Sequence, residues 1–211
     1  MTPTVEIDHL VVAAATVAQG CDYIESGLGL RPQPGGKHPT MGTHNALLGL
    51  GPKTYLEVIA IDPDAPAPGR PRWFDLDEVR MRATLAEGPR LIHFAVRTTD
   101  LAATIARARH DPGPPHAVTR GDFAWRITIP DDGHLPGAGL IPTLIQWDSV
   151  HPSTRLPANA LRLMALAGEH PEPAPVRTAL AALGLDDVKI TYGRYPRLAA
   201  MIRTPRGIVT L

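Results

Sequence analysis

Two histidines occupy matching places in the two halves of the chain, and imidazole side chains can bind a metal ion or transfer a proton. His9 lies seven positions before Thr16, and His93 lies seven positions before Asp100. Thr16 and Asp100 each come directly before a helical pattern, where a hydroxyl or a carboxylate caps the first turn. The equal spacing indicates an internal repeat with one imidazole at the same place in each copy.

An acid and an amide continue this correspondence later in each half. Glu57 lies in the string YLEV and Gln146 lies in the string LIQW, and both strings are typical of late apolar strands. Side chains alternate between the two faces of a strand, and this alternation predicts that both residues face the same interior as the histidines. A buried carboxylate at Glu57 would be costly without a cation or a hydrogen-bond donor beside it.

The elements around these residues begin with an apolar, β-branched run from Val5 to Ala13, which indicates a strand. A helix capped by Thr16 and ended by Gly29 follows. After a crossing rich in proline and glycine, His44 to Leu50 and Tyr55 to Ile61 indicate two further strands. The predicted order is a strand, a helix and then strands.

The same order returns in the second half. Leu91 to Thr98 indicates a strand, Asp100 caps a helix, and strands from Phe123 to Pro130 and from Leu140 to Asp148 follow. The two halves are therefore expected to be copies of one unit, in which a strand and a helix are followed by further strands, in an α+β protein.

A third and weaker copy of the pattern runs from Ala160 to Leu211 and has no histidine or acid at the matching positions. Its predicted elements are a strand at 161–166, a helix at 174–183 and strands near 188–192, 198–203 and 208–211. We expect it to cover the first two units rather than to form a second site, with a contact in a homodimer as the alternative.

The chain therefore divides into four predicted segments that form one cooperative whole. These are a first unit (1–62), a proline-rich connection (63–89), a second unit (90–150) and a third, degenerate unit (151–211).

Composition points to a small-molecule partner. Lysine plus arginine equals aspartate plus glutamate at 21 each, so no net charge attracts nucleic acid or an anionic membrane. The single cysteine, Cys21, excludes an intrachain disulfide, and the absence of an apolar signal segment predicts a cytoplasmic protein. Phosphate-binding glycine motifs and a serine nucleophile motif are absent, so we expect neither a nucleotide cofactor nor a covalent serine mechanism.

The paired units resemble the vicinal oxygen chelate superfamily, and several short strings resemble its glyoxalase-like group. These strings are IDHLVV from Ile7, GGKHP from Gly35, GTHN from Gly42, YLEVIA from Tyr55, and QWD with HP after Gln146. Each string is weak alone, but their order is fairly specific and the resemblance covers nearly the whole chain. It implies that repeated βαβββ modules form curled mixed sheets around one small-molecule cavity.

The resemblance also implies a metal site. In metal-bearing relatives one residue from each first strand and one from each last strand hold a divalent ion, and the matching positions here are His9, Glu57, His93 and Gln146. These ligands would suit a single zinc, nickel, iron or manganese ion and would leave positions open for a substrate. Gln146 departs from the commonest pattern, because a neutral amide binds metal weakly and cannot act as a base. That departure puts ordinary glyoxalase isomerisation in doubt.

The segment from Gly35 to Asn45 is similar to a loop at the mouth of such a cavity. In that interpretation His38, Thr43 and Asn45 would contact a substrate. Turn formation by the glycines is an alternative explanation of the same segment.

Glu57 is the candidate for proton transfer, with His38 or His151 as alternatives outside the ligand set. Trp73 follows the proline-rich connection and would either close over a ligand or pack on a sheet. His151 and Asp148 would form an acid and base pair that contacts the substrate, or only a surface histidine and a turn cap.

The sequence is compatible with two functions. In the first, a metal-assisted lyase, isomerase or dioxygenase acts on a substrate with two adjacent oxygens, and the ion stabilises an enolate-type charge. In the second, a metal-free protein binds or sequesters a small molecule, for example an antibiotic, in the same cavity.

Overall fold

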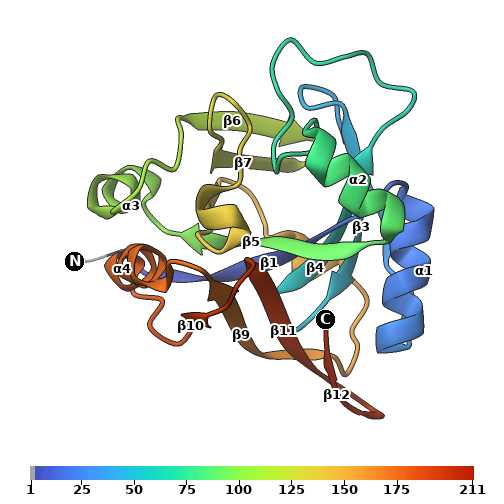
Figure 1. The fold of residues 1–211 in the computed structure, drawn as a ribbon. Coiled ribbons are helices and arrows are strands. Elements are labelled where there is room, and N and C mark those ends of the chain that lie inside the picture. The colour runs from blue at the N-terminus through green and yellow to red at the C-terminus, as the bar shows by residue number, and fades with distance from the viewer. Residues whose placement is uncertain (1–2) are drawn as a thin grey trace.

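The computed structural model describes residues 3–211 and shows a mixed α+β fold (Figure 1). The first unit consists of β1 (Val5–Ala13), α1 (Val17–Leu28), β2 (Gln33–His38), β3 (Thr43–Gly49) and β4 (Tyr55–Ile61). The predicted cap is present, because the Thr16 hydroxyl accepts a hydrogen bond from the backbone N–H of Gln19. Strand β2 was not predicted, since its sequence QPGGKH contains a proline and two glycines.

The second unit repeats this order. It consists of β5 (Arg90–Thr98), α3 (Leu101–Arg107), β6 (Pro115–Arg120), β7 (Phe123–Thr128) and β8 (Thr143–Trp147). Helix α2 (Val79–Glu87) lies in the connection between the two units, and two short 3-10 turns span Pro136–Gly139 and Pro152–Arg155.

The strands of both units form one eight-stranded mixed sheet in the order β2-β3-β4-β1-β5-β8-β7-β6. Within each unit the first strand runs parallel to the last, so that β1 pairs with β4 and β5 pairs with β8. The two units join through the antiparallel pair β1 and β5. The edge strands β2 and β6 approach each other, which curls the sheet until it is nearly closed. The predicted fold class is confirmed.

The third unit forms a separate sheet. It consists of β9 (Arg162–His170), α4 (Pro173–Leu183), β10 (Lys189–Tyr192), β11 (Arg197–Thr204) and β12 (Gly207–Thr210), in the order β10-β9-β11-β12. Its strand order differs from that of the other units, because β9 pairs in parallel with the next strand, β10, rather than with the last.

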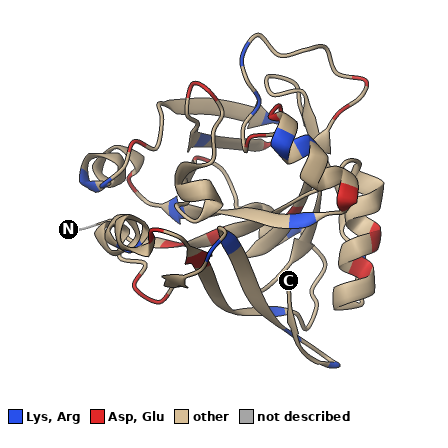
Figure 2. Ribbon diagram, in the orientation of Figure 1, with Lys and Arg blue, Asp and Glu red and all other residues tan. Residues whose placement is uncertain are grey.

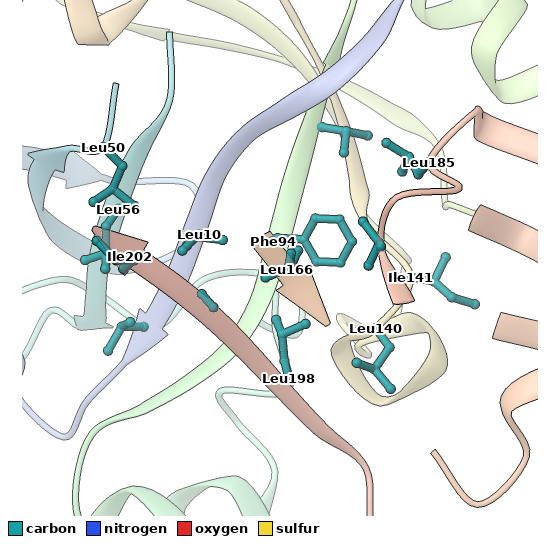
Figure 3. Close-up of a cluster of buried hydrophobic side chains, with 14 of the residues drawn as sticks. Leu10, Leu50, Leu56, Phe94, Leu140, Ile141, Leu166, Leu185, Leu198 and Ile202 are labelled. Carbon is teal, nitrogen blue, oxygen red and sulfur yellow. The ribbon is translucent and has the colours of Figure 1, made fainter. Parts of the chain in front are cut away.

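Two apolar clusters lie on opposite faces of the large sheet, as strand alternation requires. The outer cluster joins Leu10 and Phe94 of the large sheet to Leu166 and Ile202 of the third unit (Figure 3). Each large side chain buried in this way contributes about 1.5–3 kcal/mol to stability. The inner cluster faces the concave side and includes the side chains Val11, Ile59, Ala95, Trp125, Ile127 and Ile145.

Charges of both signs are interspersed along the ribbon (Figure 2), in keeping with the balanced composition. Every helix within residues 3–211 is too short or too polar to span a lipid bilayer.

Candidate functional site

A small cavity lies on the concave face of the large sheet, between the two units. Its polar lining consists of His9, His38, Asn45, Glu57 and Arg120, and its aromatic lining consists of Tyr55, Trp73, Phe74, Trp125 and Trp147. The cavity volume of about 30 Å³ is room for one water molecule. A wider open groove of about 650 Å³ lies between β5 and the third unit, and none of the predicted site residues lines it.

A β-bulge in β1 shapes this site. In the ladder between β1 and β5, Ile7 pairs with Val96 and His9 pairs with Ala95, so that Asp8 is the extra residue. The bulge turns the Asp8 side chain to the same side of the strand as the His9 side chain, and Asp8 Oδ1 lies 2.6 Å from His9 Nδ1. Simple alternation would have placed the two side chains on opposite faces.

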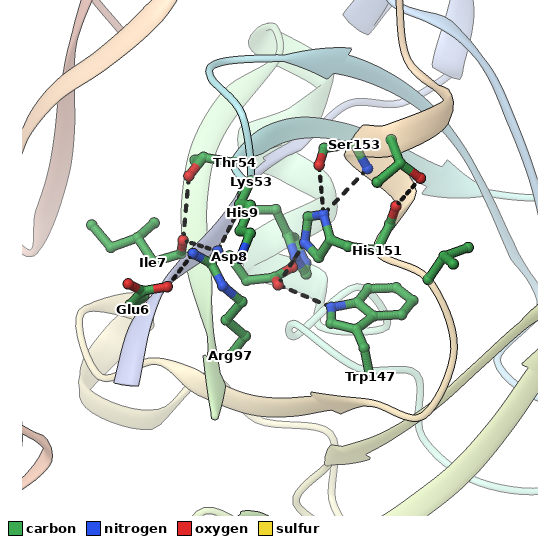
Figure 4. A network of polar contacts seen from close by, with 12 residues as sticks. Glu6, Ile7, Asp8, His9, Lys53, Thr54, Arg97, Trp147, His151 and Ser153 are labelled. Atoms are coloured by element: carbon green, nitrogen blue, oxygen red, sulfur yellow. Dashed lines mark hydrogen bonds and ion pairs between the residues drawn. The ribbon is translucent and has the colours of Figure 1, made fainter. Parts of the chain in front are cut away.

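Asp8 is the centre of a hydrogen-bond network that reaches from the cavity toward the surface (Figure 4). Its Oδ2 accepts hydrogen bonds from Trp147 Nε1 and from His151 Nε2, both at 2.9 Å. The orientation of His151 is fixed in turn by the backbone N–H of Ser153, which lies 3.2 Å from Nδ1. The fully buried carboxylate therefore has several donors.

Burial and pairing act in opposite directions on the pKa values of Asp8 and His9. Burial raises the pKa of Asp8, but hydrogen bonds from His151 and His9 outweigh it and hold that pKa well below its usual range. Burial lowers the pKa of His9, but the hydrogen bond that His9 donates to Asp8 and the charges of Asp8 and Glu57 outweigh it and raise the pKa above 6.5. The structure thus favours an aspartate beside an imidazolium.

One carboxylate oxygen of Glu57 accepts a hydrogen bond from the protein, and the other faces the cavity. Its Oε1 accepts a hydrogen bond from Asn45 Nδ2 at 2.5 Å, and its Oε2 lies 3.8 Å from His9 Nε2. That second distance is too long for a direct hydrogen bond. Within residues 3–211, Oε2 has no hydrogen-bond donor, so it remains available to a bound molecule.

The glycine-rich string fixes the amide of Asn45. Its Oδ1 accepts a hydrogen bond from the Gly36 backbone N–H at 2.9 Å, which directs Nδ2 toward Glu57. A Cβ at Gly35 would lie 2.1 Å from that Oδ1, so only glycine permits the approach. The segment predicted as a loop is thus a β2–β3 hairpin that positions a cavity residue.

His38 is a neutral member of the cavity wall. Its Nδ1 lies 3.1 Å from Thr43 Oγ1 and its Nε2 lies 3.0 Å from Arg120 Nη1. A guanidinium can only donate, so Nε2 accepts that bond and carries no proton. Burial is the main reason that the pKa of His38 falls to about 4, and the charge of Arg120 acts in the same direction. Nε2 is therefore not free to act as a base.

His93 is fully buried, and both of its ring nitrogens have partners. Nδ1 lies 3.0 Å from the Gly139 carbonyl oxygen, and Nε2 accepts from the backbone N–H of Thr143 at 3.2 Å and lies 2.9 Å from its hydroxyl. Burial lowers the pKa of His93 to about 4, so the ring is neutral. The residue fastens β5 to the start of β8.

Gln146 lies on the outer face of β8, and the expectation that it points into the shared interior is wrong. Its Oε1 accepts a hydrogen bond from the backbone N–H of Leu101 at 2.8 Å, in the first turn of α3. Its neighbour Trp147 points to the opposite side and lines the cavity.

Strand register explains this difference. Glu57 pairs with Val11 in the β1–β4 ladder, and Thr143 pairs with Ala95 in the β5–β8 ladder. Because Val11 and Ala95 each follow the matched histidine by two positions, Thr143 is the structural equivalent of Glu57. The second unit therefore has a hydroxyl where the first has a carboxylate.

The four expected ligands do not fit one metal ion. His9 and Glu57 face each other, but both nitrogens of His93 have partners and Gln146 lies on the other face. Within residues 3–211, no three His, Cys, Asp or Glu side chains are grouped so that they could hold a metal.

The remaining expected contacts divide into two groups. His38, Asn45 and Trp73 line the cavity. Thr43 instead supports His38, and His151 reaches Asp8 from a separate open pocket.

Sequence reasoning did not assign Asp8 or Arg120 to the site. The charged side chain of Asp8 in an apolar strand was a visible signal, but the bulge that redirects it depends on pairing with β5. Arg120 ends β6, a strand that was not predicted, and it had no local signal.

Comparisons with known proteins agree with this fold. The sequence model of the glyoxalase-like domain matches residues 7–184. A hypothetical protein from Staphylococcus aureus is similar in structure, with a TM-score of 0.64 and 13% identity, over 92% of this chain and 88% of that chain. This match extends into the third unit, and at such identity it shows the fold alone. A search of curated proteins finds no match.

Two epimerase structures are similar over about two thirds of the chain. Methylmalonyl-CoA epimerase from Mycobacterium tuberculosis is 17% identical, with a TM-score of 0.43, over 68% of this chain and 87% of that chain. A variant of the Streptomyces coelicolor epimerase, in complex with 2-nitronate-propionyl-CoA, is 19% identical, with a TM-score of 0.43, over 69% and 96%.

Proposed function

Because this chain belongs to the glyoxalase-like domain family, we propose that it is a small-molecule enzyme that transfers a proton next to a carbonyl group, as lyases and isomerases do. The observation that supports this proposal is the arrangement of Glu57 and His9. Within residues 3–211, a carboxylate oxygen without a donor faces an imidazole nitrogen at a small cavity with several aromatic side chains. These are the parts that general acid and base catalysis requires.

The proposed reaction begins at Glu57 Oε2, which removes a proton from the carbon next to the substrate carbonyl. The electron pair of that C–H bond moves to the carbonyl oxygen and forms an enolate. The imidazolium of His9 donates a hydrogen bond from Nε2 to this oxygen as its charge develops. Return of the proton to another carbon completes an isomerisation, and loss of a leaving group completes an elimination.

Asp8 serves this reaction as a positioning residue. Its hydrogen bond to Nδ1 fixes the orientation of the His9 ring and favours the protonated form. The stacked ring of Tyr55, 4.7 Å from that of His9, limits its rotation further.

The family resemblance implies a metal ion with four ligands, but only two of these residues, His9 and Glu57, line the cavity. A divalent ion bound there would take His9 and Glu57, which are the residues that the proposed reaction uses directly. No step of that reaction requires the ion.

A binding or sequestering function is the second candidate, and the aromatic lining favours it. Tyr55, Trp73, Trp125 and Trp147 would enclose a flat, apolar molecule. In that case the Glu57→Gln variant would retain affinity, and the wild-type protein would turn over nothing that it binds.

Solvent isotope exchange separates these functions. The purified protein is incubated in D₂O with small 2-oxo acids, their esters and 1,2-diketones, and C–H exchange is followed by proton NMR. We expect wild-type protein to accelerate exchange next to a carbonyl and the Glu57→Gln variant to lack that activity. Compounds that bind without any accelerated exchange would overturn the proposal and support sequestration.

A further inference from the structure

We infer that the cavity recognises the carboxylate of its substrate, with Arg120 as the binding residue and the indole N–H of Trp73 as a second donor. This inference names a substrate class and therefore rests on the proposed function, but a binding measurement without turnover can test it.

Arg120 enters the cavity at the seam where the two edges of the curled sheet meet. It is the last residue of β6, and its guanidinium lies beside His38 of β2. Gly36 leaves the room for it, because a Cβ there would lie 2.9 Å from Arg120 Cδ. The guanidinium also lies over the ring of Trp125, 5.8 Å from its centroid.

Arg120 forms no ion pair with any residue that the structure describes. Its contacts are His38 Nε2 at 3.0 Å and Asn45 Oδ1 at 3.4 Å, and both groups are neutral acceptors. Within residues 3–211, no carboxylate lies within 4.0 Å of it, whereas Arg72 and Arg126 both pair with aspartates. A guanidinium presents five N–H groups in a planar fork that matches a carboxylate. The free donors of a partly buried cation thus suit an anionic ligand.

Trp73 supplies an independent observation. Its side chain is 5% exposed, and its Nε1 has no hydrogen-bond partner within residues 3–211. An unsatisfied buried N–H is destabilising, and native proteins rarely leave one. Trp73 lines the same cavity and meets His38 edge to face, with ring centroids 5.1 Å apart. A ligand oxygen beside His38 would satisfy this donor.

Asn45 connects this anion site to the proposed base. Its Nδ2 contacts Glu57 Oε1 at 2.5 Å, and its Oδ1 lies 3.4 Å from Arg120 Nη1. Only the side-chain amide of Asn45 would therefore separate a substrate carboxylate bound to Arg120 from Glu57. The substrate class that fits is a short carboxylic acid whose acidic C–H lies close to the carboxylate, as in 2-oxo acids.

The present cavity is too small for such an acid, so part of its wall must move. Trp73 and Phe74 form the wall that belongs to no strand or helix, and they follow the proline-rich connection. Phe74 has φ of 62° and Asp75 has φ of 57°, conformations that non-glycine residues seldom adopt. A backbone change at Phe74 and Asp75 would relieve this strain and shift the Phe74 ring outward, which would open the cavity beside Trp73.

Intrinsic fluorescence can report binding directly, because all three tryptophans of the chain line the cavity. We propose titrations of wild-type protein with pyruvate and 2-oxobutyrate and, separately, with their uncharged methyl esters. We expect the acids to bind at least tenfold more tightly than the esters. Equal affinity for acid and ester, or no response to any 2-oxo acid, would overturn the inference.

The Arg120→Gln variant tests the residue itself, since an amide can still donate to His38 but has no charge. We expect it to lose at least tenfold in affinity for the acids and to keep its affinity for the esters. Arg126→Gln, on the neighbouring strand β7, is the matched control and should change neither. If Arg120 only joined the sheet edges, Arg120→Gln would weaken acid and ester binding equally. If that variant does not fold, Arg120→Lys keeps the charge and should keep the preference for acids, and loss of the preference in folded Arg120→Lys would contradict the inference.

The Glu57→Gln variant makes the two proposals separable. It should lose isotope exchange and still prefer acids to esters. Wild-type protein that prefers acids without accelerating exchange would remove the proposed function and leave the carboxylate site intact.

Discussion

Asp8 and His9 are neighbours along one strand, yet their side chains meet on the same side at 2.6 Å. The bulge at Asp8 makes this possible, and it gives His9 Nδ1 a buried carboxylate partner. The imidazole is consequently held in one orientation, with Nδ1 toward Asp8 and Nε2 toward Glu57. The proposed proton transfer depends on this local irregularity.

Replacement of Asp8 by asparagine should therefore cost both stability and activity. The amide removes the charge that pairs with His9 and brings N–H donors among groups that already donate. We expect a loss of about 3 kcal/mol in the free energy of unfolding, measured by urea denaturation, because a buried ion pair is broken.

Asp148→Asn is the control for that variant, since Asp148 pairs with Arg126 at the surface at 2.8 Å. An exposed pair contributes about 0–1 kcal/mol. Equal destabilisation by the two substitutions would contradict a special role for Asp8.

Stability should fall as the pH is lowered, because His38 and His93 both have a pKa of about 4 in the folded protein. The unfolded chain binds these protons at its ordinary pKa of 6.5, so the free energy of unfolding decreases between about pH 6.5 and pH 4. The expected decrease is on the order of 3 kcal/mol for each histidine. Urea denaturation across this range should show a shallower pH dependence for His93→Gln, and identical slopes would count against the buried neutral ring.

His9 acts in the opposite sense. Its pKa is raised in the folded protein, so its stabilising contribution is complete below pH 6.5 and is lost as the pH rises through the folded pKa. Activity that depends on the imidazolium should decline over the same range. A pH profile of isotope exchange that keeps rising through that range would exclude His9 as the hydrogen-bond donor to the oxyanion.

The equivalence of Glu57 and Thr143 predicts where a metal site could be built. Thr143→Glu would place a second carboxylate beside His93 and remove the hydroxyl that contacts Nε2, so manganese or zinc affinity should rise at least tenfold by calorimetric titration. Gln146→Glu should leave that affinity unchanged, because residue 146 faces α3. A rise in metal affinity for Gln146→Glu would instead support the four ligand positions that the sequence predicted, at residues 9, 57, 93 and 146.

Much of the fold follows from local sequence patterns. The run from Val5 to Ala13, the cap at Thr16 and the strand from Tyr55 to Ile61 appear in the structure with the predicted limits. Apolar periodicity and capping are properties of a few adjacent residues, so a single sequence can reveal them.

The candidate site was predictable only in part, because it depends on pairing between distant strands. His9, His38, Asn45, Glu57 and Trp73 do line the cavity. The face of Gln146 was misjudged, because the pairing of β5 with β8 makes Thr143 the equivalent of Glu57, and a residue three positions later on a strand faces the opposite side. Register depends on contacts across the sheet, and the string LIQW does not contain that information.

The most direct test of the proposed proton transfer compares Glu57 with Gln146, two residues that the sequence repeat predicts to be equivalent. Isotope exchange is measured with the best 2-oxo acid for wild-type protein, Glu57→Gln and Gln146→Ala. The account predicts that Glu57→Gln lowers the exchange rate by about 10²-fold or more, as loss of a general base does, while Gln146→Ala stays within about twofold of wild type. Comparable losses in both variants, or full activity in Glu57→Gln, would contradict it.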